Sequence, residues 1–115
     1  MKDPKINYLE YELENGEHVA MSTAPILLLR LSSKNKAAYK KMSTLMIKGV
    51  NEDDVMGLYE ILYNAYLNAN QDEENMSFTE FIESANGSFQ YNAEKAGELL
   101  GDKKKQDSET HSEEQ

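Results

Sequence analysis

The stretch from Asn51 to Asn70, NEDDVMGLYEILYNAYLNAN, constrains the fold more than any other part of the chain. Apolar side chains recur in it at steps of three and four residues, which is the spacing of one face of an α-helix. These residues are Val55, Leu58, Tyr59, Leu62, Ala65, Tyr66 and Ala69, with Ile61, Tyr63 and Leu67 widening the face. Asn51 occupies the expected N-cap position, and acidic residues follow in the first turn, where the helix dipole favours negative charge. A helix with so broad an apolar face must be covered on more than one side, so we expect it to be central.

Residues 8–21 predict a β-hairpin that precedes the helices. From residue 8 to residue 13 polar and apolar side chains alternate with a period of two, which is typical of a half-buried strand. The inward-facing set is Leu9, Tyr11 and Leu13. Asn15-Gly16 follows as a turn, because both residues tolerate positive φ, and residues 18–21 form the return strand. A lone two-stranded hairpin is marginal in water, so we expect it to lie on the helices or to pair with another chain.

Two helices are expected between the hairpin and the central helix. The first is a short apolar helix over residues 25–31, with Thr23 as its N-cap. The second runs from Lys36 to Lys48 and is capped by Ser33 or by Asn35. The buried stripe of this second helix consists of Ala38, Met42, Leu45 and Met46.

Further boundaries come from glycine and from capping residues. Gly49 is expected to end the second helix in a left-handed conformation. After the central helix, residues 77–80 (SFTE) read as a capping box, in which the serine hydroxyl and the glutamate carboxylate each bind a backbone amide. Phe89 and Tyr91 are expected in a connector, and a last helix is expected over about residues 92–100.

A chain of 115 residues suggests one domain. Residues 1–6 are expected to be a flexible N-terminal arm, and residues 7–101 a single helical domain with an N-terminal hairpin. Residues 102–115 have no apolar side chain and are expected to form a disordered polar tail. The predicted fold class is mainly α, with an N-terminal β-hairpin followed by a small bundle of four to five helices.

Composition excludes several classes of partner. The formal net charge is −9, although residues 18–51 hold six basic residues and no acid. Global acidity argues against non-specific nucleic-acid binding, which depends on neutralising phosphates. The basic stretch is either a solvated helix face or a region that attracts the acidic parts of the same chain or of another copy. No apolar run approaches the roughly 20 residues that span a bilayer, so no membrane is expected as a partner.

No arrangement of residues predicts catalysis, a metal site or a cofactor. The two histidines, His18 and His111, are isolated, and the chain has no cysteine and no glycine-rich phosphate loop. Residues 69–80 match a calcium-binding loop only at its last position, Glu80. The first position is Ala69 and the sixth is Glu74, where a calcium loop needs a ligand and a glycine. We therefore expect a binding protein rather than an enzyme.

The tyrosines of the central helix are the most suggestive feature for binding. Tyr59, Tyr63 and Tyr66 share one side of the helix, where they serve either as core packing or as a protein-binding surface. A domain this small has difficulty covering both this face and the leucine-rich turn at residues 26–31. The candidate partner-binding residues are therefore Leu27, Leu28, Leu31, Tyr59, Tyr63 and Tyr66.

Four segments follow one another as YLEYELENGEHVAM, LSSKNKAAYKKMSTLMIKG, DVMGLYEILYNAYLNAN and MSFTEFIE. In this order, over about residues 7–100, they resemble the tail assembly chaperones of long-tailed phages and prophages of Gram-positive bacteria. The resemblance implies a small, mainly helical protein of the host cytoplasm that is not kept in the mature virion. Such a chaperone coats the tape measure protein, keeps it soluble and helps to recruit subunits of the major tail tube protein.

Self-association is also expected, because several copies must line a long partner. Many members of this family are made in two lengths by ribosomal frameshifting, and the A-rich codons of residues 103–105 are a hypothetical slip site. The alternative function is that of a small adaptor or regulatory protein that binds a single host or phage protein.

Overall fold

The computed structural model describes residues 6–50 and 54–100 of the chain. The predictions for the N-terminal arm before residue 6, for the Asn51 cap and for the polar tail concern residues outside these ranges. Within them, a two-stranded antiparallel hairpin precedes a series of helices. The predicted fold class, mainly α with an N-terminal hairpin, is confirmed.

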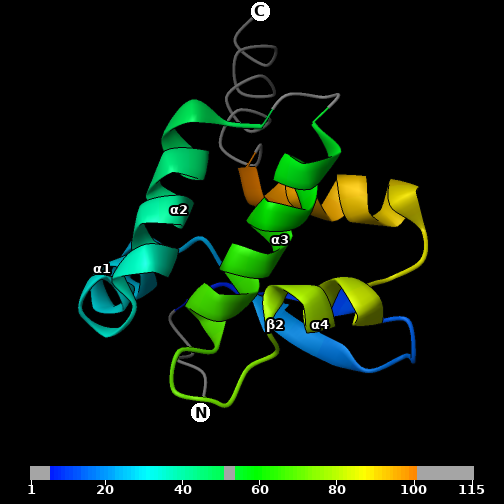
Figure 1. The fold of residues 1–115 in the computed structure, drawn as a ribbon, viewed down its shortest axis with the longest axis horizontal. Coiled ribbons are helices and arrows are strands. Elements are labelled where there is room, and N and C mark those ends of the chain that lie inside the picture. The colour runs from blue at the N-terminus through cyan, green and yellow to red at the C-terminus, as the bar shows by residue number, and fades with distance from the viewer. Residues whose placement is uncertain (1–5, 51–53, 101–115) are drawn as a thin grey trace, which may run out of the picture.

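The central helix of the prediction is also central in the structure. The elements are β1 (Leu9–Glu12), β2 (His18–Met21), α1 (Pro25–Lys34), α2 (Lys36–Lys48), α3 (Val55–Ala69) and α4 (Phe78–Ser84), followed by a helix over residues 89–100. Helix α3 contacts α1, α2, α4 and β2. Figure 1 shows α2 and α4 on different sides of α3.

Helix α3 starts with a side-chain cap and then buries most of its length. The Asp54 carboxylate accepts a hydrogen bond from the Gly57 N–H at 2.9 Å, so Asp54 is the N-cap of the helix as described. Ile61, Leu62 and Ala65 have no exposed surface. The broad apolar face is therefore covered from several sides, as its width required.

The hairpin has the predicted inward and outward faces but a different turn. Tyr11 and Leu13 are buried, whereas Glu10 and Glu12 are exposed. The Leu13 N–H donates to the Glu17 carbonyl at 2.7 Å, which leaves a loop of residues 14–16. Only Gly16 has positive φ in this loop, because in a three-residue hairpin loop a single residue needs it.

Helix α2 has the predicted ends. Of the two candidate caps, Asn35 is the one observed: its side chain accepts a hydrogen bond from the Ala38 N–H at 3.1 Å. At the other end, Gly49 donates its N–H to the Leu45 carbonyl at 2.7 Å. Its φ of 78° is positive, as predicted, but its ψ of −174° is extended rather than left-handed helical. Only glycine adopts this combination readily.

The cap of α1 differs from the prediction, whereas that of α4 agrees with it. Ala24 is the N-cap of α1, and the Thr23 hydroxyl instead donates to the Leu99 carbonyl at 3.5 Å. At α4 the capping box is complete: the Ser77 hydroxyl accepts from the Glu80 N–H, and the Glu80 carboxylate accepts from the Ser77 N–H at 2.8 Å.

The helix over residues 89–100 starts three residues earlier than expected. Phe89 and Tyr91 lie in this helix and not in a connector. The cause is local: the Ser88 hydroxyl accepts from the Tyr91 N–H, and the Ser88 carbonyl accepts from the Asn92 N–H, both at 3.1 Å. Serine is among the most favourable N-caps, so Ser88 is a local signal for the start of this helix.

A buried polar network joins the hairpin to two helices. Tyr11 has no exposed surface, and its hydroxyl donates to the Asn92 side-chain oxygen. The same hydroxyl accepts from the Asn86 N–H at 3.0 Å. The Asn92 amide in turn donates to the Tyr59 hydroxyl at 3.2 Å and to the Asn86 carbonyl at 2.8 Å. Burial raises the pKa of Tyr11 to about 12, because the phenolate would be poorly solvated there.

Candidate functional site

The three candidate tyrosines of α3 take part in internal contacts. Tyr66 is buried, and its hydroxyl accepts from the Met76 N–H at 2.9 Å. Tyr63 is half-buried, and its hydroxyl donates to the Met76 carbonyl at 2.9 Å. Burial raises the pKa of Tyr63, and the neighbouring Tyr66 adds to this effect. Tyr59 is half-buried and accepts from Asn92. These rings therefore hold the loop after α3 and the last helix in place.

The candidate leucines of α1 are also turned inward. Leu27 and Leu31 are buried, and Leu28 is half-buried against the core. Together with Tyr66, the two buried leucines contact the interior of the chain and present no surface to a partner in this conformation. The physical reason is that α1 and α3 cover each other, while the hairpin and α4 cover the rest of α3.

The exposed apolar surface lies on other residues than the six candidates. The large exposed apolar residues are Ile26, Leu29, Met46, Ile47, Val55, Met56, Ile82 and Phe89. The most exposed are Ile47 at 84% and Leu29 at 67%. Helices α2 and α3 are antiparallel (Figure 1), so the end of α2, with Met46 and Ile47, lies near the start of α3, with Val55 and Met56. The sequence predicts Met46 in the buried stripe of α2 and Val55 on the apolar face of the central helix; both predictions are wrong, because Met46 is 36% and Val55 52% exposed.

A shallow, open groove of about 290 Å³ lies between α2 and α3. Its lining is mainly apolar and includes Ala37, Ala38, Tyr63, Leu67 and Phe78. Tyr63 is thus the one candidate residue that reaches this groove. The floor and walls come from two helices and from the start of α4, so the groove exists only when all three are packed together.

The polar side chains that border this groove include Lys41 and Glu60, together with the cap residue Asn35. The Lys41 ammonium lies 3.1 Å from the Glu60 carboxylate, which links α2 to α3. The Asn64 side chain is only 6% exposed and donates its amide N–H to the Glu60 carbonyl at 2.8 Å. Asn64 is also one of the residues that line the groove.

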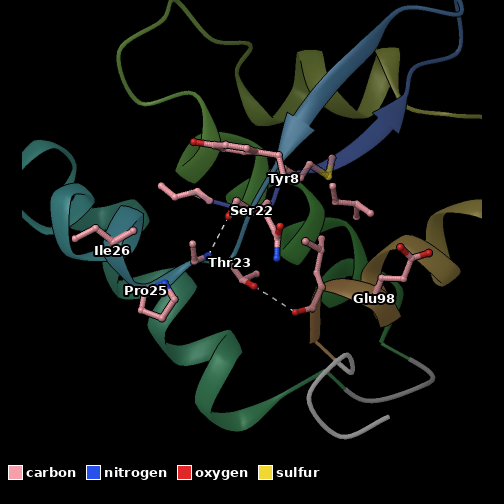
Figure 2. A pocket seen from close by; sticks show the side chains of 12 residues that line it. Tyr8, Ser22, Thr23, Pro25, Ile26 and Glu98 are labelled. Atoms are coloured by element: carbon pink, nitrogen blue, oxygen red, sulfur yellow. Dashed lines mark hydrogen bonds between the residues drawn. The ribbon is translucent and has the colours of Figure 1, made fainter. Parts of the chain in front are cut away.

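A second hollow, of about 580 Å³, opens where the hairpin, α1 and the last helix meet. Figure 2 shows Pro25 and Ile26 on one side of it, Glu98 on the other, and Ser22 and Thr23 between them. Both hydroxyls are already used: the Ser22 oxygen accepts from the Ala24 N–H at 3.0 Å, and Thr23 donates to Leu99. Glu98 is the only charged residue in the described lining of this hollow.

The titratable groups elsewhere are dispersed over the surface. His18 lies 3.2 Å from the Glu10 carboxylate, and both are solvent-exposed. Over residues 6–50 and 54–100, no group of three or more His, Asp or Glu side chains is placed to hold a metal ion. In the same ranges, no helix has the length and apolar character needed to cross a membrane.

Comparison of the chain with models of protein families, with curated proteins and with solved structures gave no match. Any assignment of function therefore depends on the sequence resemblance and on the surface described above.

Proposed function

We propose that this protein is a phage tail assembly chaperone that binds the tape measure protein, keeps it soluble and helps to recruit subunits of the major tail tube protein. The proposal rests on the resemblance of residues 7–100 to that family and needs no chemistry from the chain. It places the protein in the host cytoplasm during assembly and outside the finished virion.

The observation that carries the proposal is the amount of apolar surface left exposed on a small helical protein. Leu29 on α1 is 67% exposed to solvent, and Ile47 on α2 is 84% exposed. Met46 and Met56 add flexible thioether side chains, which adapt to irregular partner surfaces. Many modest contacts of this kind suit reversible binding along a long partner.

Co-expression with the cognate tape measure protein tests the proposal. The wild-type protein is expected to raise the soluble fraction of the tape measure protein several-fold. A Leu29→Glu/Ile47→Glu variant should lose most of this effect, because two carboxylates replace exposed apolar contacts. The matched control is Thr79→Glu/Gln90→Glu, which adds the same charge at two exposed positions on α4 and on the last helix.

Two results would decide against a chaperone. If the wild-type protein leaves the tape measure protein insoluble, the adaptor hypothesis replaces it, with a single host or phage protein as partner. If both double variants retain full activity, the exposed apolar residues do not form the binding surface. Self-association is part of the same proposal, and light scattering of the purified protein measures it directly.

A further inference from the structure

We propose that the acidic segment at residues 106–115 folds back onto the basic outer face of α2 and shields this face from other acidic partners. The outer face consists of four residues of α2: Lys36, Lys40, Thr44 and Lys48. The inference goes beyond the proposed function and does not depend on it, because it concerns a contact within one chain.

The outer face of α2 is basic and solvent-exposed. Its four residues follow one another at steps of four, and all of them are exposed. Neither α1 nor α2 contains an acidic residue. Over residues 6–50 and 54–100 the three lysines of this face form no ion pair, whereas Lys41 pairs with Glu60. The face therefore carries three ammonium groups that no carboxylate of the described residues neutralises.

The positions of these lysines make a nearby carboxylate favourable. Lys36 is the first residue of α2, where the helix dipole disfavours a cation, and the first turn holds no acidic residue. Lys36 and Lys40 also lie four residues apart on the helix, at a spacing where like charges repel each other. Carboxylates beside this end of α2 therefore relieve two unfavourable interactions at once.

The charge of residues 106–115 is complementary to this face. The segment has no lysine or arginine, and its acidic residues are Asp107, Glu109, Glu113 and Glu114. The lysines at 103–105 precede the segment and come soon after the last helix, whose own charges include acidic residues. The charge pattern therefore directs the acidic residues, and not these lysines, towards a basic face.

The last helix ends on the side of the molecule that carries α1 and α2. The Thr23 hydroxyl, two residues before α1, donates to the Leu99 carbonyl at 3.5 Å, and α1 packs against α2. Figure 1 shows the last helix running towards the side that carries α2. Six extended residues, 101–106, span about 20 Å, which is also about the length of α2. The acidic segment is therefore long enough to reach the whole outer face.

The covalent connection favours the segment of the same chain over that of a second copy. Ion pairs between exposed groups are individually weak, so the local concentration of carboxylates decides which of them occupy the face. A short linker holds its two ends at an effective concentration on the order of millimolar. This value exceeds the concentration of other copies in a dilute solution.

A spin label at residue 115 tests the contact in the full-length protein. The chain has no cysteine, so Gln115→Cys provides a single attachment site. The amide signals of Lys36, Lys40 and Thr44 are expected to lose at least half of their intensity, whereas those of α4 should lose less than a tenth. About 0.5 M sodium chloride should restore most of the intensity, because salt screens exposed charges. Undiminished α2 signals, or equal losses over α2 and α4, would overturn the proposal.

A mixed sample shows whether the contact lies within one chain. Isotope-labelled protein without the spin label is combined with unlabelled protein that carries it. The α2 signals of this mixture are expected to keep their intensity. A loss as large as in the directly spin-labelled protein would assign the acidic segment to a second copy and overturn the proposal.

Charge variants identify the groups that hold the segment. Lys36→Gln/Lys40→Gln removes two cations of the outer face and should reduce the loss of the Thr44 signal at least threefold. The matched control, Lys103→Gln/Lys104→Gln, removes the same charge outside the face and should leave the loss unchanged. Equal effects of the two double variants would show that net charge, and not the outer face, holds the segment.

A labelled decaglutamate peptide tests the shielding. Glu113→Gln/Glu114→Gln should bind this peptide at least threefold more tightly than the wild-type protein in fluorescence anisotropy at low salt, because the outer face is then less occupied. The matched control, Glu83→Gln/Glu94→Gln, removes the same charge at two exposed positions of α4 and the last helix. It should change the affinity less than 1.5-fold. Equal affinities of the wild-type protein and the first variant, or equal gains in the two variants, would contradict shielding.

Discussion

Removal of the Tyr11 hydroxyl should destabilise the fold, because it breaks a buried polar network. Tyr11 lies on β1, and its hydroxyl connects Asn92, 81 residues away, with the backbone of Asn86. Tyr11→Phe keeps the ring, which packs with centroid distances of 5.9 Å to Phe81 and 5.5 Å to Tyr91. The substitution therefore isolates the polar contribution from the packing.

The magnitude follows from the groups that lose their partner. The Asn92 side chain has no exposed surface, so water does not replace the hydroxyl at its oxygen. A buried polar group left unpaired costs about 1–3 kcal/mol, and the Asn86 N–H adds a smaller cost because it is only partly buried. The expected loss in the free energy of unfolding is therefore about 2–4 kcal/mol.

Urea unfolding followed by circular dichroism measures this loss by linear extrapolation. The matched control is Tyr39→Phe, since the half-buried Tyr39 makes no hydrogen bond through its hydroxyl among the described residues. The control should change the free energy of unfolding by less than about 0.5 kcal/mol. A loss below that value for Tyr11→Phe as well would show that the network contributes nothing to stability, and the reasoning would be refuted.

The same tyrosine predicts a dependence of stability on alkaline pH. Burial raises the pKa of Tyr11 from 10.0 to about 12, so the folded state holds this proton more tightly than the unfolded state. Its contribution is fully present below pH 10 and is lost as pH rises towards 12, with a total of about 3 kcal/mol. The free energy of unfolding of the wild-type protein should therefore fall more steeply in this range than that of Tyr11→Phe. Parallel curves for the two proteins would contradict the assignment.

Three further substitutions test other parts of the fold. Ser77→Ala removes the capping-box hydroxyl of α4 and should cost about 1 kcal/mol in urea unfolding; no change would mean that the box is not formed in solution. Gly49→Ala forces a side chain into a conformation with φ of 78°, and a loss of about 1–3 kcal/mol is expected even though space is available around it. Phe81→Ala opens a cavity at a site with no exposed surface and should lower stability by about 3–5 kcal/mol, whereas an intact melting temperature would rule out the described core.

Much of the fold could be read from the sequence because its signals act over a few residues. The period of the apolar residues in α3, the Asn35 cap and the Ser77–Glu80 capping box depend only on neighbours within one helical turn. The same holds for the alternation of β1, which places Tyr11 inside. The start of the last helix also depends on a local signal, because the Ser88 hydroxyl caps it within one turn.

The tertiary structure alone decided which apolar side chains remain on the surface. In α1 the sequence shows a nearly continuous apolar run, and nothing local distinguishes buried Leu27 and Leu31 from exposed Ile26 and Leu29. That distinction depends on which face of α1 meets α3, a contact between distant parts of the chain. Capping and periodicity are properties of neighbours in sequence, whereas burial is a property of neighbours in space. The groove between α2 and α3 therefore appears only once the helices are packed.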